Sequence, residues 1–110
     1  MRQRLSVPAA WLAASLLSAI GPALAQTRHG DAERGHHLAE TFCAQCHLIA
    51  PNLGGSWTDA PPFPELARDP KRDQAWFRRF VQQPHWHMMG TNRSQPEADD
   101  LAAYFTTLRQ

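Results

Sequence analysis

Two thiols and an imidazole lie within five residues near the middle of the chain. Cys43 and Cys46 are the only cysteines among the 110 residues, and His47 directly follows the second of them. Cysteine sulfur and imidazole nitrogen can bind a metal ion, take part in redox exchange or attach a cofactor covalently. The spacing of these three residues and their surroundings decide among these kinds of chemistry.

Three alternatives fit this pattern poorly. A disulfide between Cys43 and Cys46 would close only a tiny loop and would stabilise the fold little. A thioredoxin-like redox pair follows a strand, and no strand is predicted before Cys43. A zinc site needs a second pair of ligands, for which only scattered histidines are available. The sequence C-A-Q-C-H is instead typical of covalent attachment of c-type haem, in which both thiols bind the cofactor and His47 ligates its iron.

The first 25 residues have the features of an export signal. Two arginines precede an uncharged, mostly apolar stretch over residues 5–20, and Ala23-Leu24-Ala25 has the form of a signal-peptidase site. We therefore expect a cleaved signal over residues 1–25, a mature domain over residues 26–110, a periplasmic location and no membrane span after cleavage. An uncleaved anchor is the alternative, although two prolines interrupt an apolar run that is already short for a spanning helix.

The expected mature segment is small and nearly neutral. Removing 25 of the 110 residues leaves 85, enough for one domain whose core usually needs a disulfide, a metal or a cofactor for stability. Because Arg2 and Arg4 belong to the signal, 9 basic residues remain against 10 acidic ones, a net charge of −1 with neutral histidines. This balance argues against a nucleic-acid-binding protein, which would be strongly basic.

The first and last predicted helices have clear start signals. The first begins after Asp31, a potential N-cap, and runs through Phe42 into the cysteine motif. Gly35 in its interior is less favourable than alanine by about 1 kcal/mol, which favours a close approach by another helix. The last helix begins at the capping box Ser94-Gln95-Pro96-Glu97. Its apolar stripe is formed by Ala98, Leu101, Ala102, Phe105 and Leu108.

A middle helix is predicted from Pro70 to Gln83, with Asp69 as its cap. The preceding segment, Leu48 to Pro70, is so rich in proline and glycine that it is predicted to be a loop. A loop of this length is unusual in a compact domain unless something orders it. A large apolar cofactor would supply that order through the loop's bulky apolar side chains. These are Leu53, Trp57, Phe63 and Leu66, while Trp76, Phe77, Phe80 and Val81 form the core face of the middle helix.

Together these features resemble a small bacterial class I cytochrome c over essentially the whole mature segment. The landmarks are Gly35, the motif Cys43 to His47, Ala60-Pro61-Pro62-Phe63, Pro84-His85-Trp86-His87-Met88 and Asp100-Leu101-Ala102-Ala103-Tyr104-Phe105. The resemblance implies an all-α fold of about three main helices and long loops around one covalently bound haem c, with its iron, per chain. It also implies that the last helix meets Gly35 through Leu101 and Tyr104.

The resemblance also implies which residues lie on the two sides of the haem iron. The carbonyl of Pro61 is expected to hold the ring of His47, with neighbouring Pro62 as the alternative. In the family pattern a methionine ligand stands twelve residues before the aspartate-leucine pair of the last helix, which selects Met88, because 100 minus 88 is 12. Met89 occupies the place where proline usually follows, so a shift of register to Met89 stays open. The remaining candidates for the sixth ligand are His85 and His87.

The function implied by the resemblance is that of an exported single-haem electron carrier between a redox-protein donor and acceptor, and not that of an enzyme. The alternatives are a subunit of a larger dehydrogenase or oxidase, or a haem enzyme with peroxidase or gas-binding activity if the sixth ligand is labile. We accordingly expect a monomer or a subunit of a redox complex.

Several charged and ionisable side chains are expected simply to face solvent. The basic ones are Arg68, Lys71, Arg72, Arg78 and Arg79 around the middle helix, the acidic ones are Asp99 and Asp100, and the histidines are His29, His36 and His37.

Overall fold

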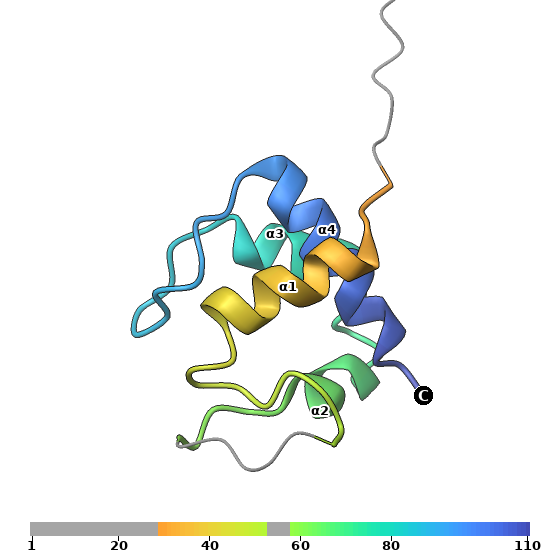
Figure 1. The fold of residues 1–110 in the computed structure, drawn as a ribbon. Helices are drawn as coiled ribbons and strands as arrows, with labels where there is room; N and C mark the ends of the chain where they lie inside the picture. The colour runs from red at the N-terminus through yellow and green to blue at the C-terminus, as the bar shows by residue number, and fades with distance from the viewer. Residues whose placement is uncertain (1–28, 53–57) are drawn as a thin grey trace, which may run out of the picture.

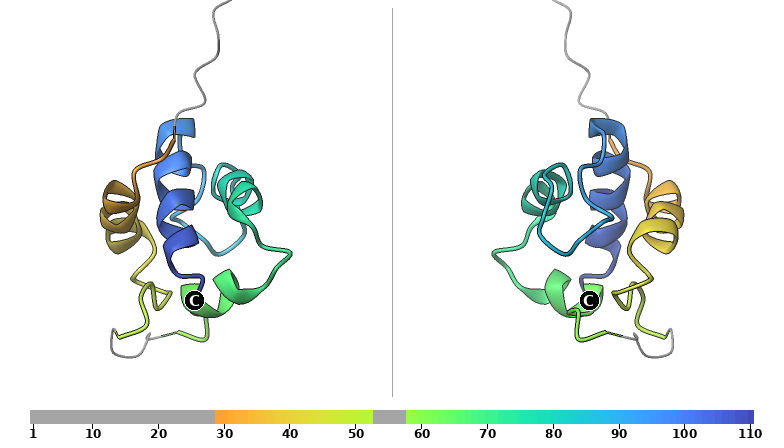
Figure 2. Two further views of the ribbon diagram at one scale, coloured as in Figure 1. Left: turned by 90° about the vertical axis from the view of Figure 1, so that its right-hand side faces the viewer. Right: turned by 90° about the vertical axis from the view of Figure 1, so that its left-hand side faces the viewer.

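The computed structural model describes residues 29–52 and 58–110, and these residues contain four helices and no strand. The helices are α1 (Ala32–Phe42), α2 (Phe63–Arg68), α3 (Gln74–Val81) and α4 (Gln95–Thr107). α4 lies between α1 and α3, and α2 lies near its C-terminal end (Figures 1 and 2). The all-α prediction is therefore confirmed, while the predicted signal over residues 1–25, together with Leu53 and Trp57, lies outside the described residues.

The predicted starts of α1 and α4 are confirmed. The Asp31 side chain accepts a hydrogen bond from the backbone N–H of Arg34 at 2.9 Å. At the start of α4, Ser94 and Glu97 form the reciprocal capping box, in which each side chain accepts from the other residue's backbone N–H. The whole apolar stripe predicted for this helix is buried. Each of these helix starts is specified by residues within one turn, which explains why the sequence pattern located them.

The predicted start of the middle helix is wrong. α3 begins after Asp73, whose side chain accepts from the backbone N–H three residues further on at 2.7 Å. Asp69 instead closes a turn before the helix, and Pro70 lies outside it. Both aspartates satisfy the N-cap pattern, but Asp69 is the C-cap of α2, so the middle helix begins only after Asp73.

The prediction of a loop over residues 48–70 is wrong for α2. Pro62 is the N-cap of this short helix and Pro64 lies in its first turn, where the missing N–H groups are not needed. The helix buries Phe63 and Ala67 against the rest of the core. The prolines that indicated irregular structure therefore mark a helix start.

α1 and α4 cross at Gly35. A Cβ atom there would overlap the backbone carbonyl of Asp100 and lie 2.8 Å from Cβ of Tyr104, so no other residue fits without moving a helix. This confirms the predicted close approach and the contact with Tyr104. The nearest backbone belongs to Asp100, whereas Leu101 is not among the atoms that a Cβ would meet first.

The expectation that Asp100 faces solvent is wrong, since only 5% of the residue is exposed. Its carboxylate accepts from the backbone N–H of Asp31 at 2.8 Å and from the guanidinium of Arg34 at 3.0 and 3.2 Å. The hydrogen bonds between Arg34 and Asp100 raise the pKa of the Arg34 guanidinium. Asp100 thereby links the middle of α4 to the start of α1, a role that needs two segments 69 residues apart in sequence.

Some of the basic residues around α3 also form contacts with other side chains. Arg78 forms an ion pair with Asp99, and Arg72 pairs with Asp69 at 3.5 Å. The guanidinium of Arg72 also lies over the ring of Trp76, 5.5 Å from its centroid. Two of the five basic residues are therefore paired with carboxylates, which reduces the charge that this face presents to solvent.

Replacing Asp100 with alanine is expected to lower the free energy of unfolding by about 1–3 kcal/mol, because the N–H of Asp31 would lose its acceptor at a crowded helix contact. Arg34→Ala is the matched control and should lower it less, since that side chain is 54% exposed. Denaturant unfolding followed by circular dichroism measures both variants. Equal losses would mean that the ion pair, and not the backbone bond, accounts for the role of Asp100.

Candidate functional site

The cysteine motif directly follows α1. Cys43 is the C-cap of this helix, and the backbone N–H of Ala44 also reaches the carbonyl of Ala39, which widens the last turn. The N–H groups of Cys46 and His47 then both donate to the carbonyl of Cys43, at 3.1 and 2.9 Å. The motif is therefore a series of tight turns that follows the helix, and Cys46 lies outside α1.

The two cysteines differ in their surroundings although they line the same pocket. Cys43 is half-buried and Cys46 is exposed. Burial raises the pKa of the Cys43 thiol to about 11, despite the opposing effect of nearby Arg93. A thiol with a raised pKa is a poor nucleophile at neutral pH, which is unlike the cysteines of thiol–disulfide exchange enzymes.

His47 is oriented by a single backbone group. Its Nδ1 lies 2.7 Å from the carbonyl oxygen of Pro61. Since a carbonyl can only accept, Nδ1 carries the hydrogen, and Nε2 keeps a lone pair available for a metal. The carbonyl of Pro62 instead accepts from the N–H groups of Glu65 and Leu66 in α2. The two neighbouring prolines thus have different partners: one contacts the histidine and the other begins a helix.

The segment after the motif is hydrogen-bonded to α4. The hydroxyl of Tyr104 donates to the carbonyl of Ile49 at 2.9 Å, and Ile49 is fully buried. On the other side, the ring of His47 packs against Phe63 of α2, with centroids 5.3 Å apart. The imidazole is therefore held between elements whose positions are set by the core.

The four candidates for the sixth ligand lie in the segment between α3 and α4. The ring of His85 stacks on Phe80, with centroids 3.8 Å apart, and its Nε2 lies 2.9 Å from the Phe80 carbonyl. His87 is exposed and has a positive φ of 67°. Met88 is half-buried, whereas Met89 is 91% exposed. The two methionines are thus clearly distinguished by burial, although both touch the rim of the pocket.

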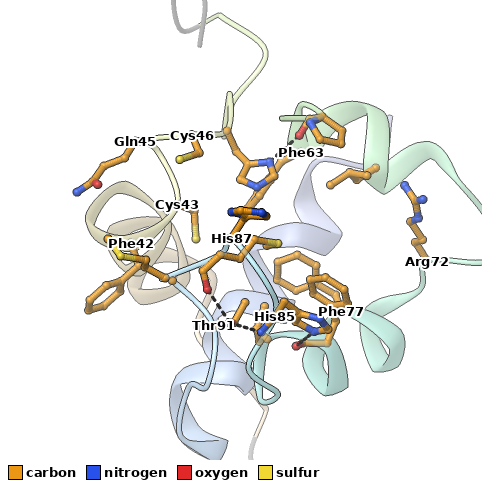
Figure 3. A pocket seen from close by; sticks show the side chains of 18 of the residues that line it. Phe42, Cys43, Gln45, Cys46, Phe63, Arg72, Phe77, His85, His87 and Thr91 are labelled. Carbon is orange, nitrogen blue, oxygen red and sulfur yellow. Dashed lines mark hydrogen bonds between the residues drawn. The ribbon is translucent and has the colours of Figure 1, made fainter. Parts of the chain in front are cut away.

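A pocket of about 760 Å³ lies among these elements (Figure 3). In this view Cys43 and Cys46 lie on one side, and Phe77 and Arg72 lie on the other. The walls come from the end of α1 with the cysteine motif, from Pro61 and α2, from α3, and from residues 85–91. Pockets that hold cofactors are mostly apolar and have volumes of about 300–1,000 Å³.

These residues fit a covalently attached haem. Two thiols, a histidine nitrogen with an available lone pair and a methionine sulfur all border one apolar pocket of sufficient size. Among residues 29–52 and 58–110, no group of three or more histidine, cysteine, aspartate or glutamate side chains could hold a metal ion by itself. Two thiols, an imidazole and a thioether around one apolar pocket are a donor set that suits a covalently attached haem.

Some residues at the pocket were not identified from the sequence. Gly90 and Thr91 follow the two methionines and line its wall, and the guanidinium of Arg93 lies 4.1 Å from the ring centroid of Phe42. Of the expected surface histidines, His36 is half-buried and packs against Tyr104 at 4.8 Å between centroids. No local pattern marks any of these residues, because their contacts are with distant elements.

Comparison with known proteins gives a relative over most of the chain. The chain is similar to cytochrome c-552 of Bradyrhizobium diazoefficiens, with 33% identity over 94 residues, which cover 86% of this chain and 90% of that protein. No family model matches the chain, and no solved structure matches it. The relationship implies a covalently bound haem c with its iron and a role in electron transfer. The chain therefore belongs to the small bacterial class I monohaem cytochromes c.

Proposed function

We propose that the mature chain is an exported electron carrier that holds one haem c through Cys43, Cys46, His47 and Met88, and passes one electron at a time between two redox proteins. The observation that supports this most strongly is that both thiols, the histidine and the methionine border one apolar pocket. The similarity to a cytochrome c-552 supports the same function.

The cysteine motif would provide the attachment and one ligand to the iron. Cys43 and Cys46 would each form a thioether bond, and Nε2 of His47 would ligate the iron. The hydrogen bond from Nδ1 of His47 to Pro61 supports this role, because it fixes the tautomer and keeps the ring from rotating. Pro61 would therefore act through the orientation of His47.

Met88 is the proposed sixth ligand. Its partial burial at the pocket favours it over Met89, which is almost fully exposed. The imidazole of His85 instead contacts Phe80, through its Nε2 and through ring stacking. A thioether ligand favours ferrous iron and raises the reduction potential, as an electron carrier requires. As a ligand, Met88 would also occupy the position at which a peroxidase or a gas-binding protein binds its ligand, which favours a carrier over an enzyme.

The bound haem would supply the one-electron chemistry by alternating between ferric and ferrous iron. The protein would supply ligation and a dry environment. Phe63, Phe77 and Val81 form apolar walls that exclude water from the site. Cys46 is exposed, so the side of the pocket that it borders is accessible to a redox partner.

The proposed location and partners rest on the sequence. A cleaved signal over residues 1–25 would deliver the chain to the periplasm, where c-type haem is attached. The described residues include no helix with the length and hydrophobicity needed to cross a membrane. We propose a redox-protein donor and a redox-protein acceptor as partners, with the chain acting as a monomer or within a redox complex.

Mass spectrometry of the exported protein tests the attachment. We expect the chain from residue 26 with one covalently bound haem. Cys43→Ala and Cys46→Ala should each retain only the other thioether bond, while Met89→Ala, the matched control, should keep both. A processed chain without haem and with a disulfide between Cys43 and Cys46 would refute the proposed function.

A further inference from the structure

The segment that carries Met88 lacks the proline that usually follows the methionine ligand in this family. Met89 stands in that place, so the backbone φ angle after Met88 is not restricted by a ring. The ligand segment must therefore be held by other contacts. These contacts are visible in the structure around a tight turn formed by residues 85–88.

The turn itself is closed by one backbone bond, from the N–H of Met88 to the carbonyl of His85 at 3.1 Å. His87 is the third residue of the turn, and its φ of 67° lies in the left-handed region. In turns with this conformation, the third residue is usually glycine or asparagine. A histidine there is disfavoured unless the surroundings hold it in place. The turn therefore requires support from outside its own four residues.

Thr91 gives that support. It is only 6% exposed, and its hydroxyl donates to the carbonyl of Met88 at 2.9 Å. The same oxygen accepts from the backbone N–H of His85 at 3.2 Å. One buried hydroxyl thus bonds both ends of the turn, as the dashed lines in Figure 3 show.

The first residue of the turn and the residues that follow the turn are anchored by further contacts. His85 is held by its ring stacking and its Nε2 contact with Phe80 in α3. Gly90 lies so close to α1 that a Cβ on it would be 2.5 Å from the carbonyl oxygen of Phe42. The N–H of Arg93 donates to the carbonyl of Val81 at 2.8 Å. With both flanks fixed, the bonds of Thr91 determine the conformation of the turn between them.

We propose that Thr91 is a positioning residue that holds Met88, and not Met89, toward the pocket. Its two hydrogen bonds do what the ring of a proline after the ligand does elsewhere in the family: they restrict the backbone beside the sulfur that ligates iron. This inference rests on the proposed role of Met88 as the sixth ligand.

The rate at which imidazole binds to the oxidised haem protein tests this role, because an added ligand can bind only after Met88 leaves the iron. Thr91→Val removes the hydroxyl but keeps the shape, and it should speed imidazole binding about tenfold, the effect expected for the loss of a buried hydrogen bond. Thr91→Ser keeps the hydroxyl and should bind imidazole at nearly the wild-type rate. A wild-type rate in Thr91→Val would overturn the proposal.

Tyr104→Phe is the matched control, since it removes another buried hydroxyl-to-carbonyl bond at a distance from the ligand segment. It should lower the melting temperature without speeding imidazole binding. An equal acceleration in Tyr104→Phe would mean that general destabilisation is responsible, and would also overturn the proposal.

Two further measurements separate the possible failures. If Met88→Ala leaves the absorption spectrum of the oxidised protein unchanged, the proposed ligation itself is wrong; if it changes the spectrum while Thr91→Val behaves as wild type, only the role of Thr91 is wrong. Hydrogen exchange on the wild-type haem protein needs no variant to fold. The amide of His85 should exchange much more slowly than that of Trp86, which is 86% exposed, and equally fast exchange would contradict the bond to Thr91.

Discussion

Replacing Met88 with alanine is expected to change the proposed haem site more than any other single substitution. The oxidised protein should lose the long-wavelength absorption band that marks methionine ligation in this family. The reduction potential should fall by about 0.1 V or more, because axial ligands set haem potentials over a range of about 0.8 V. The iron should also become open to carbon monoxide and cyanide. Redox titration and ligand-binding spectra measure these changes.

Met89→Ala is the matched control, because it removes the same side chain one residue further along, where it is 91% exposed. It should leave the spectrum and the potential nearly unchanged. If Met89→Ala caused these changes instead, the register taken from Asp100 and Leu101 would be wrong by one residue. If neither variant changed the spectrum, His85 or His87 would become the leading ligand. A wild-type protein that rapidly bound carbon monoxide and turned over peroxide would favour an enzyme.

Production of the mature chain without haem is expected to leave it largely disordered. The pocket takes up about 760 Å³ beside core residues such as Phe63, Phe77 and Val81. Without haem, water would fill this pocket and leave its apolar walls exposed. We therefore expect the chain to lose much of its stability without the cofactor.

The lengths of the helices lead to the same expectation. α2 has 6 residues and α3 has 8, and isolated helices shorter than about 12–15 residues are marginal in water. These two helices depend on packing around the pocket. Circular dichroism of the haem-free chain, with the haem protein as control, measures their loss. Full helix content and a cooperative melt in the haem-free chain would show that the haem does not organise this half of the fold.

The features that were predictable from the sequence depend on residues close together in the chain. The cysteine motif concentrates its chemistry in five residues, so its type and spacing indicate haem attachment without reference to the fold. The N-cap at Asp31 and the capping box at Ser94 and Glu97 each act within one turn of helix. Gly35 is the exception, since an unfavourable residue inside a helix indicated a contact that a distant segment provides.

Where the sequence offered two residues for the same role, only the folded structure distinguished between them. Asp69 and Asp73 are both suitable N-caps, but in the folded chain Asp69 ends α2 and Asp73 begins α3. The Pro61 and Pro62 carbonyls are adjacent in sequence, yet the start of α2 engages one and leaves the other to contact His47. Local sequence cannot distinguish such neighbours, because they differ only in what surrounds them in the folded chain.

The amino-acid sequence alone determined that this is a haem-binding helical protein, because attachment chemistry and helix capping are short-range. Only the tertiary structure decided that Asp100 is buried where α4 meets the start of α1, that Met88 is half-buried while Met89 is exposed, and that Thr91 bonds both ends of the turn before it. Burial is a property of the whole packed chain. A side chain's exposure therefore depends on residues far away in sequence, and no local pattern records it.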